Sequence, residues 1–183
     1  MLSYTEENYL KAIYHLSNHG TNEVTTNAIS EALSTKPASV SDMLKKLSQK
    51  KVINYEKYYG VKITTEGKKY ALKVIRKHRL WEVFLVQKLG FHWDEVHEIA
   101  EQLEHIQSSL LIERLDEFLG FPKYDPHGDP IPTESGEIKE PVKVLLSEMQ
   151  PEETGIIISV KESSQAFLQY LDKLGISLGT PVK

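Results

Sequence analysis

The stretch from residue 96 to residue 106, VHEIAEQLEHI, restricts the fold most, because its residues divide between two sides of one helix. Successive helical residues advance by about 100°, so positions three, four, seven and eight apart share a side. One arc holds the apolar residues Val96, Ile99, Ala100, Leu103 and Ile106. The other holds only carboxylates and imidazoles: His97, Glu101, Glu104 and His105. Any fold of this chain must bury the apolar arc, and the arc of carboxylates and imidazoles requires a separate, chemical explanation.

The charges of the chain are divided along its length. From Lys36 to Arg79 there are 13 Lys and Arg against 3 Asp and Glu, whereas from Glu82 to Glu117 there are 2 against 9. The formal net charge of -4 conceals this division. A basic segment indicates a polyanionic partner, and an acidic one indicates cations. The alternative is that both segments are solvated helix faces.

Composition limits the class of protein. With 183 residues, 40% hydrophobic and 26% charged, the chain can form one large or two to three small domains with packed cores. The absence of cysteine excludes disulfides and thiolate metal sites. The first ten residues, MLSYTEENYL, do not resemble a signal peptide, and the richest apolar run, 80–89, contains Glu82, Gln87 and Lys88. We therefore expect a cytoplasmic protein without a membrane span.

The first third of the chain has the order of a winged helix-turn-helix. Helices are predicted over 3–18, with Ser3 and Glu6 as a capping box, over 27–33 after Thr25 and Thr26, and from Pro37 onward. A β-hairpin follows over 52–64, with its turn at Tyr59-Gly60. This order predicts a unit that places its third helix in the major groove of DNA.

The exposed face of that third helix suits DNA. Small polar residues at its start allow close approach to base edges, and later lysines suit phosphates. Tyr55 and Lys62 add to the wing of the unit. The predicted DNA-binding residues are Thr26, Lys36, Pro37, Ala38, Ser39, Ser41, Asp42, Lys45, Lys46, Lys57 and Tyr58. The alternative is a winged-helix module that binds protein, but the density of basic residues favours double-stranded DNA.

Beyond residue 64 the patterns predict three more helices and a small strand-containing segment. Thr65 is expected to cap a long helix over 66–89, followed by helices over 94–106 and 109–119, with Gly120 as a stop. A Pro/Gly-rich linker covers 121–136. Strands are expected over 142–149, 155–160 and 179–183, around a helix over 163–175.

The long helix carries a second polar pair. His78 and Glu82 are four residues apart, and Glu82 shares a side with apolar residues such as Leu85. A carboxylate there is costly to bury unless a cation or hydrogen-bond donors compensate it. One such pair alone is more typical of a surface contact. Pairs of acids and imidazoles on two consecutive helices indicate an oxygen and nitrogen metal site.

These motifs together resemble the diphtheria-toxin-repressor and manganese-transport-regulator family of metal-dependent transcriptional repressors. The resemblance rests on TEENYLKAIYHL, PASVSDMLKKL, KHRLWEVFL, VHEIAEQLEH, DPHGDPIP and the tail PEETGIIISV…LGISLGTPVK. It implies a mainly α fold with a winged helix-turn-helix DNA-binding domain (1–72), a helical metal-binding and dimerisation domain plus linker (73–137), and a small SH3-like β domain (138–183). The chain stops at Lys183, which predicts a partial barrel. It also implies a homodimer on a palindromic operator.

The resemblance also implies the metal ligands. The principal metal would be held by Asn8, Glu101, Glu104 and His105, with His78 close by. An ancillary site would use Glu82, Asp125 and His127, with His97 in some relatives and Glu162 from the third domain. His15, His19 and His92 match no ligand position, and we interpret them as ordinary surface or packing residues. A cation that joins Asn8 to the second domain would fix the spacing of the two recognition helices.

Two substitutions bear on the metal. Manganese regulators of this family usually have aspartate where this chain has Asn8, and iron regulators use cysteine where it has Glu101. With carboxylates, imidazoles and no sulfur, we favour Mn(II), with Fe(II) second and Zn(II) or Co(II) binding in vitro. The expected function is metal-dependent repression of metal-uptake genes.

Two alternatives remain open at this point. A metal-independent winged-helix regulator would treat the acidic helices as a scaffold. A metalloenzyme is the remote alternative, because Gln102 interrupts the di-iron pattern and the HExxH pattern also fails. We expect no catalytic residue and no small-molecule substrate.

Overall fold

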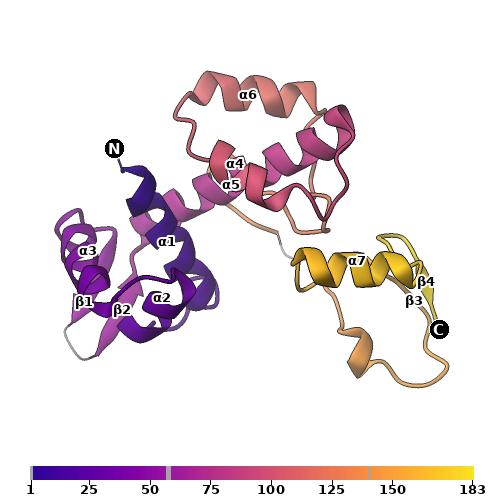
Figure 1. Cartoon of the computed structure of the whole chain (residues 1–183), viewed down its shortest axis with the longest axis horizontal. Coiled ribbons are helices and arrows are strands. Elements are labelled where there is room, and N and C mark those ends of the chain that lie inside the picture. Colours follow the sequence, from indigo (N-terminus) through magenta and orange to yellow (C-terminus); the bar gives the residue numbers. More distant parts are fainter. Residues whose placement is uncertain (1, 57–58, 140) are drawn as a thin grey trace. The chain divides into compact units, whose positions relative to one another are not determined.

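The computed structural model describes residues 2–56, 59–139 and 141–183 (Figure 1). The chain divides into two compact units. Unit 1 holds the residues up to Ile75 together with Glu134–Glu137, and unit 2 holds Arg76–Thr133 and Ile138–Lys183. None of the helices in the described ranges is long and apolar enough to cross a membrane.

Unit 1 confirms the order of a winged helix-turn-helix. Its elements are α1 (Tyr4–Leu16), α2 (Thr26–Ala32), α3 (Pro37–Gln49), β1 (Ile53–Glu56) and β2 (Gly60–Ile63). The two strands pair antiparallel, with Ile53 opposite Ile63 and Glu56 opposite Gly60. Val24, which lies before α2, forms a bridge to Val61 and extends the hairpin.

Local capping explains where the first helices start. Ser3 and Glu6 form the predicted capping box, and Glu6 also accepts a hydrogen bond from Lys50 at the end of α3, at 2.8 Å. Burial raises the pKa of Glu6, but the hydrogen bonds from Lys50 and Ser3 outweigh it and lower the pKa. Thr25 caps α2, and Pro37 occupies the first position of α3 as expected. The core beneath these helices is aliphatic, with no exposed surface on Leu10, Ile13, Ile29, Val40, Leu44 and Leu47.

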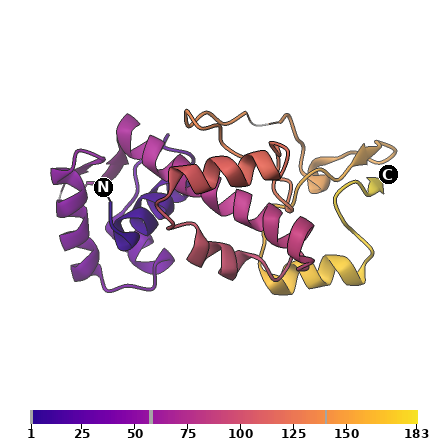
Figure 2. The ribbon, with the colours of Figure 1, turned by 90° about the horizontal axis from the view of Figure 1, so that it is seen from above.

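Three helices of unit 2 pack around one apolar cluster. α4 (Thr65–Leu89) begins in unit 1 and continues into unit 2, where α5 (His97–Leu103) and α6 (Ser109–Phe118) follow (Figure 2). Leu80, Trp81 and Val83 of α4 pack with Ala100 of α5 and Leu115 of α6. Gly120 ends α6 as predicted, at a positive φ of 74°.

Two predicted boundaries in this region were wrong. The cap of α4 is Thr64, whose Oγ1 accepts the backbone N–H of Gly67 at 3.1 Å, rather than Thr65. The helix expected over 94–106 extends only from His97 to Leu103. Before it, the carboxylate of Glu95 accepts the N–H of His92 and closes a separate turn; after it, Ile106 donates to Leu103 in a tighter turn.

The C-terminal segment of unit 2 contains less strand than predicted. Its elements are a 3-10 turn η1 (Leu146–Glu148), β3 (Gly155–Ile156), α7 (Gln165–Lys173) and β4 (Pro181–Val182), with β3 antiparallel to β4. The strand predicted over 142–149 is absent from the described residues. A strand needs a partner for its backbone, and Val142 and Val144 are instead exposed in the structure. Leu168 and Leu171 of α7 pack with Trp93 in a separate small core.

Candidate metal centre

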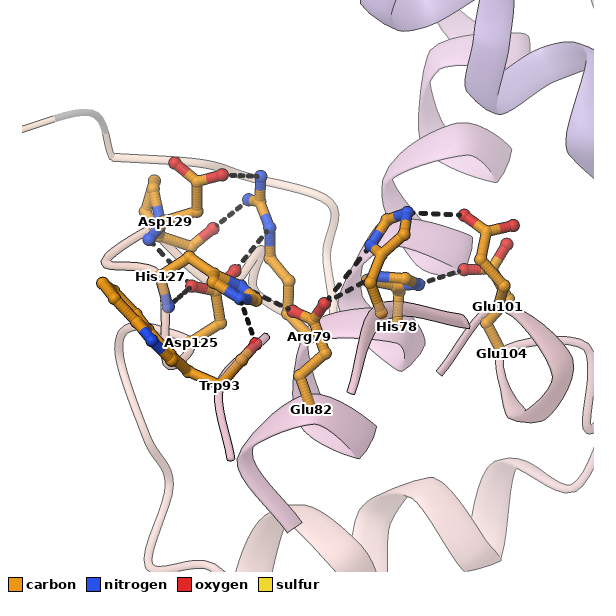
Figure 3. Close-up of polar contacts among 11 residues, drawn as sticks. His78, Arg79, Glu82, Trp93, Glu101, Glu104, Asp125, His127 and Asp129 are labelled. Carbon is orange, nitrogen blue, oxygen red and sulfur yellow. Dashed lines mark hydrogen bonds and ion pairs between the residues drawn. The ribbon is translucent and has the colours of Figure 1, made fainter. Parts of the chain in front are cut away.

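Glu82 is buried in the middle of a group of imidazoles and carboxylates in unit 2 (Figure 3). It belongs to α4, and only 2% of its surface is exposed. Its Oε1 lies 2.9 Å from Nε2 of His78 and 3.6 Å from Nδ1 of His97. Its Oε2 lies 3.6 Å from Nδ1 of His127. One buried carboxylate therefore faces three imidazoles.

The three imidazoles lower the pKa of Glu82 and so favour its ionised form. Burial alone raises the pKa of Glu82, but hydrogen bonds from His127, His78 and His97 outweigh burial and hold its pKa well below its ordinary range. Burial lowers the pKa of His127, but the carboxylates of Glu82 and Asp125 outweigh that effect and raise it. The site thus compensates buried negative charge with positive charge, which protons or a divalent cation can supply.

A tight turn at residues 124–130 brings Asp125 and His127 to Glu82. Asp125 Oδ1 accepts the backbone N–H groups of His127 at 2.8 Å and of Asp129 at 3.0 Å, which fixes the turn. Its Oδ2 lies 3.3 Å from Nε of Arg79. Burial, and next the charge of Glu82, raise the pKa of Asp125 to about 6 against the opposing charge of Arg79. Asp125 therefore stabilises the turn in addition to being part of the group around Glu82.

His78 joins this group to Glu104, the residue that follows α5. Its Nδ1 lies 2.6 Å from Oε2 of Glu104, which is fully buried, while its Nε2 faces Glu82. Carboxylate oxygens only accept, so His78 makes both contacts as hydrogen bonds only when both ring nitrogens carry hydrogen. His97 Nε2 lies 3.7 Å from Oε1 of Glu101, and His105 Nε2 lies 3.4 Å from Oε1 of Glu104.

Around Glu82 and His78, two sets of side chains have the spacing that a metal ion needs. In the Glu82 cluster (Glu82, Asp125 and His127) and in the His78 cluster (His78, His97 and Glu101), one ligand atom of each residue lies within 4.8 Å of the others. Both clusters offer only oxygen and nitrogen. These donors, with buried carboxylates that require positive charge, fit a hard divalent ion such as Mn(II) or Fe(II).

Four predicted ligands belong to neither cluster. Asn8 is on α1 in unit 1, and its Oδ1 is buried with no hydrogen-bond partner among the described residues. Glu162 lies exposed in the C-terminal segment, where it accepts a hydrogen bond from Ser164. Glu104 and His105 lie beside the His78 cluster through their contacts with each other and with His78.

The predicted DNA-binding residues lie mostly on one exposed face of unit 1. The exposed ones are Lys36, Pro37, Ala38, Ser39, Asp42, Lys45 and Lys46, while Ser41 and Thr26 are half-buried. Lys45 pairs with Asp42 at 2.9 Å, and Ser41 Oγ donates to the carbonyl of Pro37. Lys57 and Tyr58 fall outside the described residues.

Sequence patterns missed two residues that shape the centre. Arg79 pairs with Asp125 and Asp129 and donates to the carbonyl of Pro130 (Figure 3). Trp93 accepts a hydrogen bond from His127 through its backbone carbonyl. The available signals were a basic residue next to His78 and a tryptophan within the polar stretch HWDE, neither of which identifies a partner.

Three family models match this chain in succession. The iron-dependent repressor N-terminal DNA-binding domain matches residues 1–61, and the iron-dependent repressor metal-binding and dimerisation domain matches 64–133. The FeoA domain matches residues 144–183. Together they cover most of the chain, in the order that the fold follows.

Individual relatives agree with these matches. The HTH-type transcriptional regulator MntR of Oceanobacillus iheyensis is 33% identical over 119 residues, which is 65% of this chain and 80% of the relative. The iron-dependent repressor IdeR of Mycobacterium leprae is 34% identical over 128 residues, or 70% of this chain and 55% of the relative. A solved manganese-dependent transcriptional repressor in complex with manganese aligns with a TM-score of 0.86 at 35% identity, over 96% of this chain and 81% of that one.

Proposed function

This chain belongs to the iron-dependent repressor family, and on that premise we propose that its DNA binding requires a divalent metal. We propose Mn(II) as the physiological metal and Fe(II) second, with Zn(II) and Co(II) able to bind in vitro. The family consists of transcriptional repressors, not enzymes, so the metalloenzyme alternative is set aside. We further propose that this chain represses metal-uptake genes in the cytoplasm.

The observation that carries the proposal is the burial of Glu82 among imidazoles. A carboxylate with 2% exposure, facing His78, His97 and His127, is expensive to retain in a core for structure alone. A divalent cation supplies the compensating charge more strongly than protons can. Glu82, Asp125 and His127 would hold one ion. His78, Glu101, Glu104 and His105 would hold another, because their donors also suit Mn(II).

Asn8 is the ligand through which a bound metal ion would affect DNA binding. It lies on α1, in the unit that contains the recognition helix, and its buried Oδ1 has no donor among the described residues. An amide oxygen can coordinate a hard cation, although it brings no charge. We propose that Asn8 and Glu162 complete the two sites, and that the chain has three domains, 1–72, 73–137 and 138–183.

The partner would be double-stranded DNA read by a homodimer. The exposed start of α3 suits base edges, and Lys45 and Lys46 suit phosphates. Leu110 and Phe118 of α6 are exposed, at 61% and 63%, and offer an apolar face for the dimer. A two-fold dimer reads two half-sites of opposite direction, so we propose a palindromic operator.

The decisive experiment is a DNA-binding titration with and without Mn(II). Operator DNA is selected from a random pool by the Mn(II)-loaded chain, and its affinity is measured by fluorescence anisotropy at fixed salt. We expect Mn(II) to tighten binding by roughly 5- to 150-fold, as coupled sites usually do, and a chelator to reverse this. Calorimetry should give the reciprocal result, with DNA tightening Mn(II) binding.

The matched variants are Glu101→Ala with His105→Ala, and Glu98→Ala on the exposed side of the same helix. The double variant should lose the Mn(II) response, and Glu98→Ala should keep it. Equal DNA affinity with Mn(II) and with chelator in the wild-type chain would establish the metal-independent regulator instead.

A further inference from the structure

Trp93 belongs by sequence to the loop before α5, but its side chain lies in the core of the C-terminal segment. It is 9% exposed and packs with Leu168 and Leu171 of α7. Its Nε1 donates to both carboxylate oxygens of Asp172 at 3.2 Å. Trp93 therefore fastens the loop that precedes α5 to α7.

The residues on each side of Trp93 strengthen this contact. Asp94 accepts a hydrogen bond from Gln169 of α7 at 2.9 Å, and His92 Nδ1 lies 3.8 Å from Asp172. His92, Asp94 and Asp172 also have the spacing of a metal group. Trp93 already donates to Asp172 and Gln169 to Asp94, and His92 is 57% exposed. We therefore interpret this group as part of the attachment of the loop to α7 rather than as a metal site.

The backbone of the same residue fixes a predicted metal ligand. His127 Nε2 donates to the carbonyl of Trp93 at 2.8 Å, and the two rings stack with centroids 6.1 Å apart (Figure 3). A carbonyl oxygen only accepts, so the hydrogen of the neutral imidazole must be on Nε2. Nδ1, which lies 3.6 Å from Glu82, is then the nitrogen with a free lone pair. This is the arrangement that metal coordination through Nδ1 requires.

The C-terminal segment also contacts the turn that carries His127. The backbone N–H of Val160 donates to the carbonyl of His127 at 3.0 Å. At Gly128, with φ of 84°, an added Cβ would lie 2.0 Å from the carbonyl oxygen of Ile158, so only glycine allows this approach. His127 is thus held through its ring by Trp93 and through its backbone by Val160.

From this double attachment we propose that Trp93 is a positioning residue that makes metal binding at the Glu82 cluster and docking of the C-terminal segment depend on each other. The inference rests on the proposed metal site and adds a means of regulation. A docked α7 holds Trp93, Trp93 orients His127, and an oriented His127 binds the ion. By linkage, the bound ion must stabilise the docked α7 by the same factor.

The test uses the full chain with Glu101→Ala and His105→Ala, which isolates the Glu82 cluster. Into this background are placed Trp93→Ala, Trp93→Phe and, remote from the metal ligands, Leu171→Ala. Mn(II) affinity is measured by calorimetry, and docking by amide hydrogen exchange of Val160 and α7. Tyr170→Ala, which is 56% exposed on α7, is the matched control. Circular dichroism verifies that each variant is folded.

We expect Trp93→Ala and Leu171→Ala to weaken Mn(II) binding by roughly 10- to 100-fold, the usual effect of losing support behind a ligand. Trp93→Phe should restore most of the affinity, and Tyr170→Ala should leave it unchanged. In the background chain Mn(II) should slow exchange at Val160 and in α7.

Three results would overturn the inference. The first is wild-type Mn(II) affinity in a folded Leu171→Ala chain whose α7 exchanges freely. The second is exchange in α7 that does not respond to bound Mn(II). The third is absence of Mn(II) binding even in the unsubstituted chain, which would refute the proposed function as well, whereas the first two leave that function intact.

Discussion

Unit 1 buries aliphatic side chains such as Leu10, Ile29 and Leu44, whereas unit 2 buries His78, Glu82, Glu104, Asp125 and His127. Unit 1 does bury two carboxylates, those of Glu6 and Glu7, and Lys50 and the N–H of Ser3 satisfy that of Glu6 within the same unit. In unit 2 the acids depend on imidazoles whose own charge depends on protons. The difference indicates that most of the buried charge that a cation can compensate lies in unit 2.

The largest expected effect comes from the core of unit 1. Leu44→Ala removes a side chain with no exposed surface, which should lower the free energy of unfolding by about 2–5 kcal/mol. The loss should be the same with Mn(II) and with a chelator, because the cavity forms among aliphatic neighbours. Urea unfolding followed by hydrogen exchange in α2 measures it. A loss that changes with Mn(II) would break the contrast between the units.

The second effect is the response of unit 2 to metal. Mn(II) at 100 times its dissociation constant should raise the free energy of unfolding by about 2.7 kcal/mol, and a chelator should remove this gain. Glu82→Gln should reduce this gain, because it removes the charge at the centre of one of the two proposed sites. The exposed Glu98→Gln is the control on α5. Exchange in α5 should respond to Mn(II) more strongly than exchange in α2.

The third effect concerns the DNA-binding surface alone. Lys45→Ala should weaken binding to all sequences and reduce the slope of log affinity against log salt by roughly 0.9, as loss of one phosphate contact does. Mn(II) affinity in the absence of DNA should remain unchanged. Lys173→Ala, exposed on α7, should leave the slope as it is. An unchanged slope in Lys45→Ala would remove this residue from the DNA contacts.

The smallest effect is a pH dependence of α7 docking. The hydrogen bond with Asp94 raises the pKa of His92, and the charges of Asp172, Asp94 and Glu95 act in the same direction. Stabilisation from His92 is therefore fully present below the ordinary histidine pKa of about 6.5 and is lost as pH rises through the higher folded value. Exchange in α7 should accelerate over that range. His92→Gln should flatten this dependence, and His19→Gln in unit 1 should not.

Short-range patterns predicted the start of the fold well. The capping box of Ser3 and Glu6, Pro37 at the first position of α3 and the stop at Gly120 each involve only a few neighbouring residues, so the sequence contains their full physical cause. The predicted strand over 142–149 was wrong because a strand also needs a partner, which no local pattern specifies.

The candidate centre was predicted in its parts but not in its connections. Spacing on α4 and α5 indicated His78, Glu82, His97 and Glu101, and the family resemblance added Asp125 and His127. That His127 is oriented by Trp93, 34 positions earlier, depends on how the chain folds back. Arg79 was missed for the same reason, since its partner Asp125 is far along the chain.

The stacking of Trp93 on His127 makes the fluorescence of Trp93 an intrinsic probe of the metal site. The chain has only two tryptophans, and Trp81 lies in the separate apolar cluster of α4, α5 and α6. An ion bound at Nδ1 of His127 would change the charge next to this indole, so it should change the emission of one of the two tryptophans. Loading of the Glu82 cluster can then be followed in real time without attaching a dye.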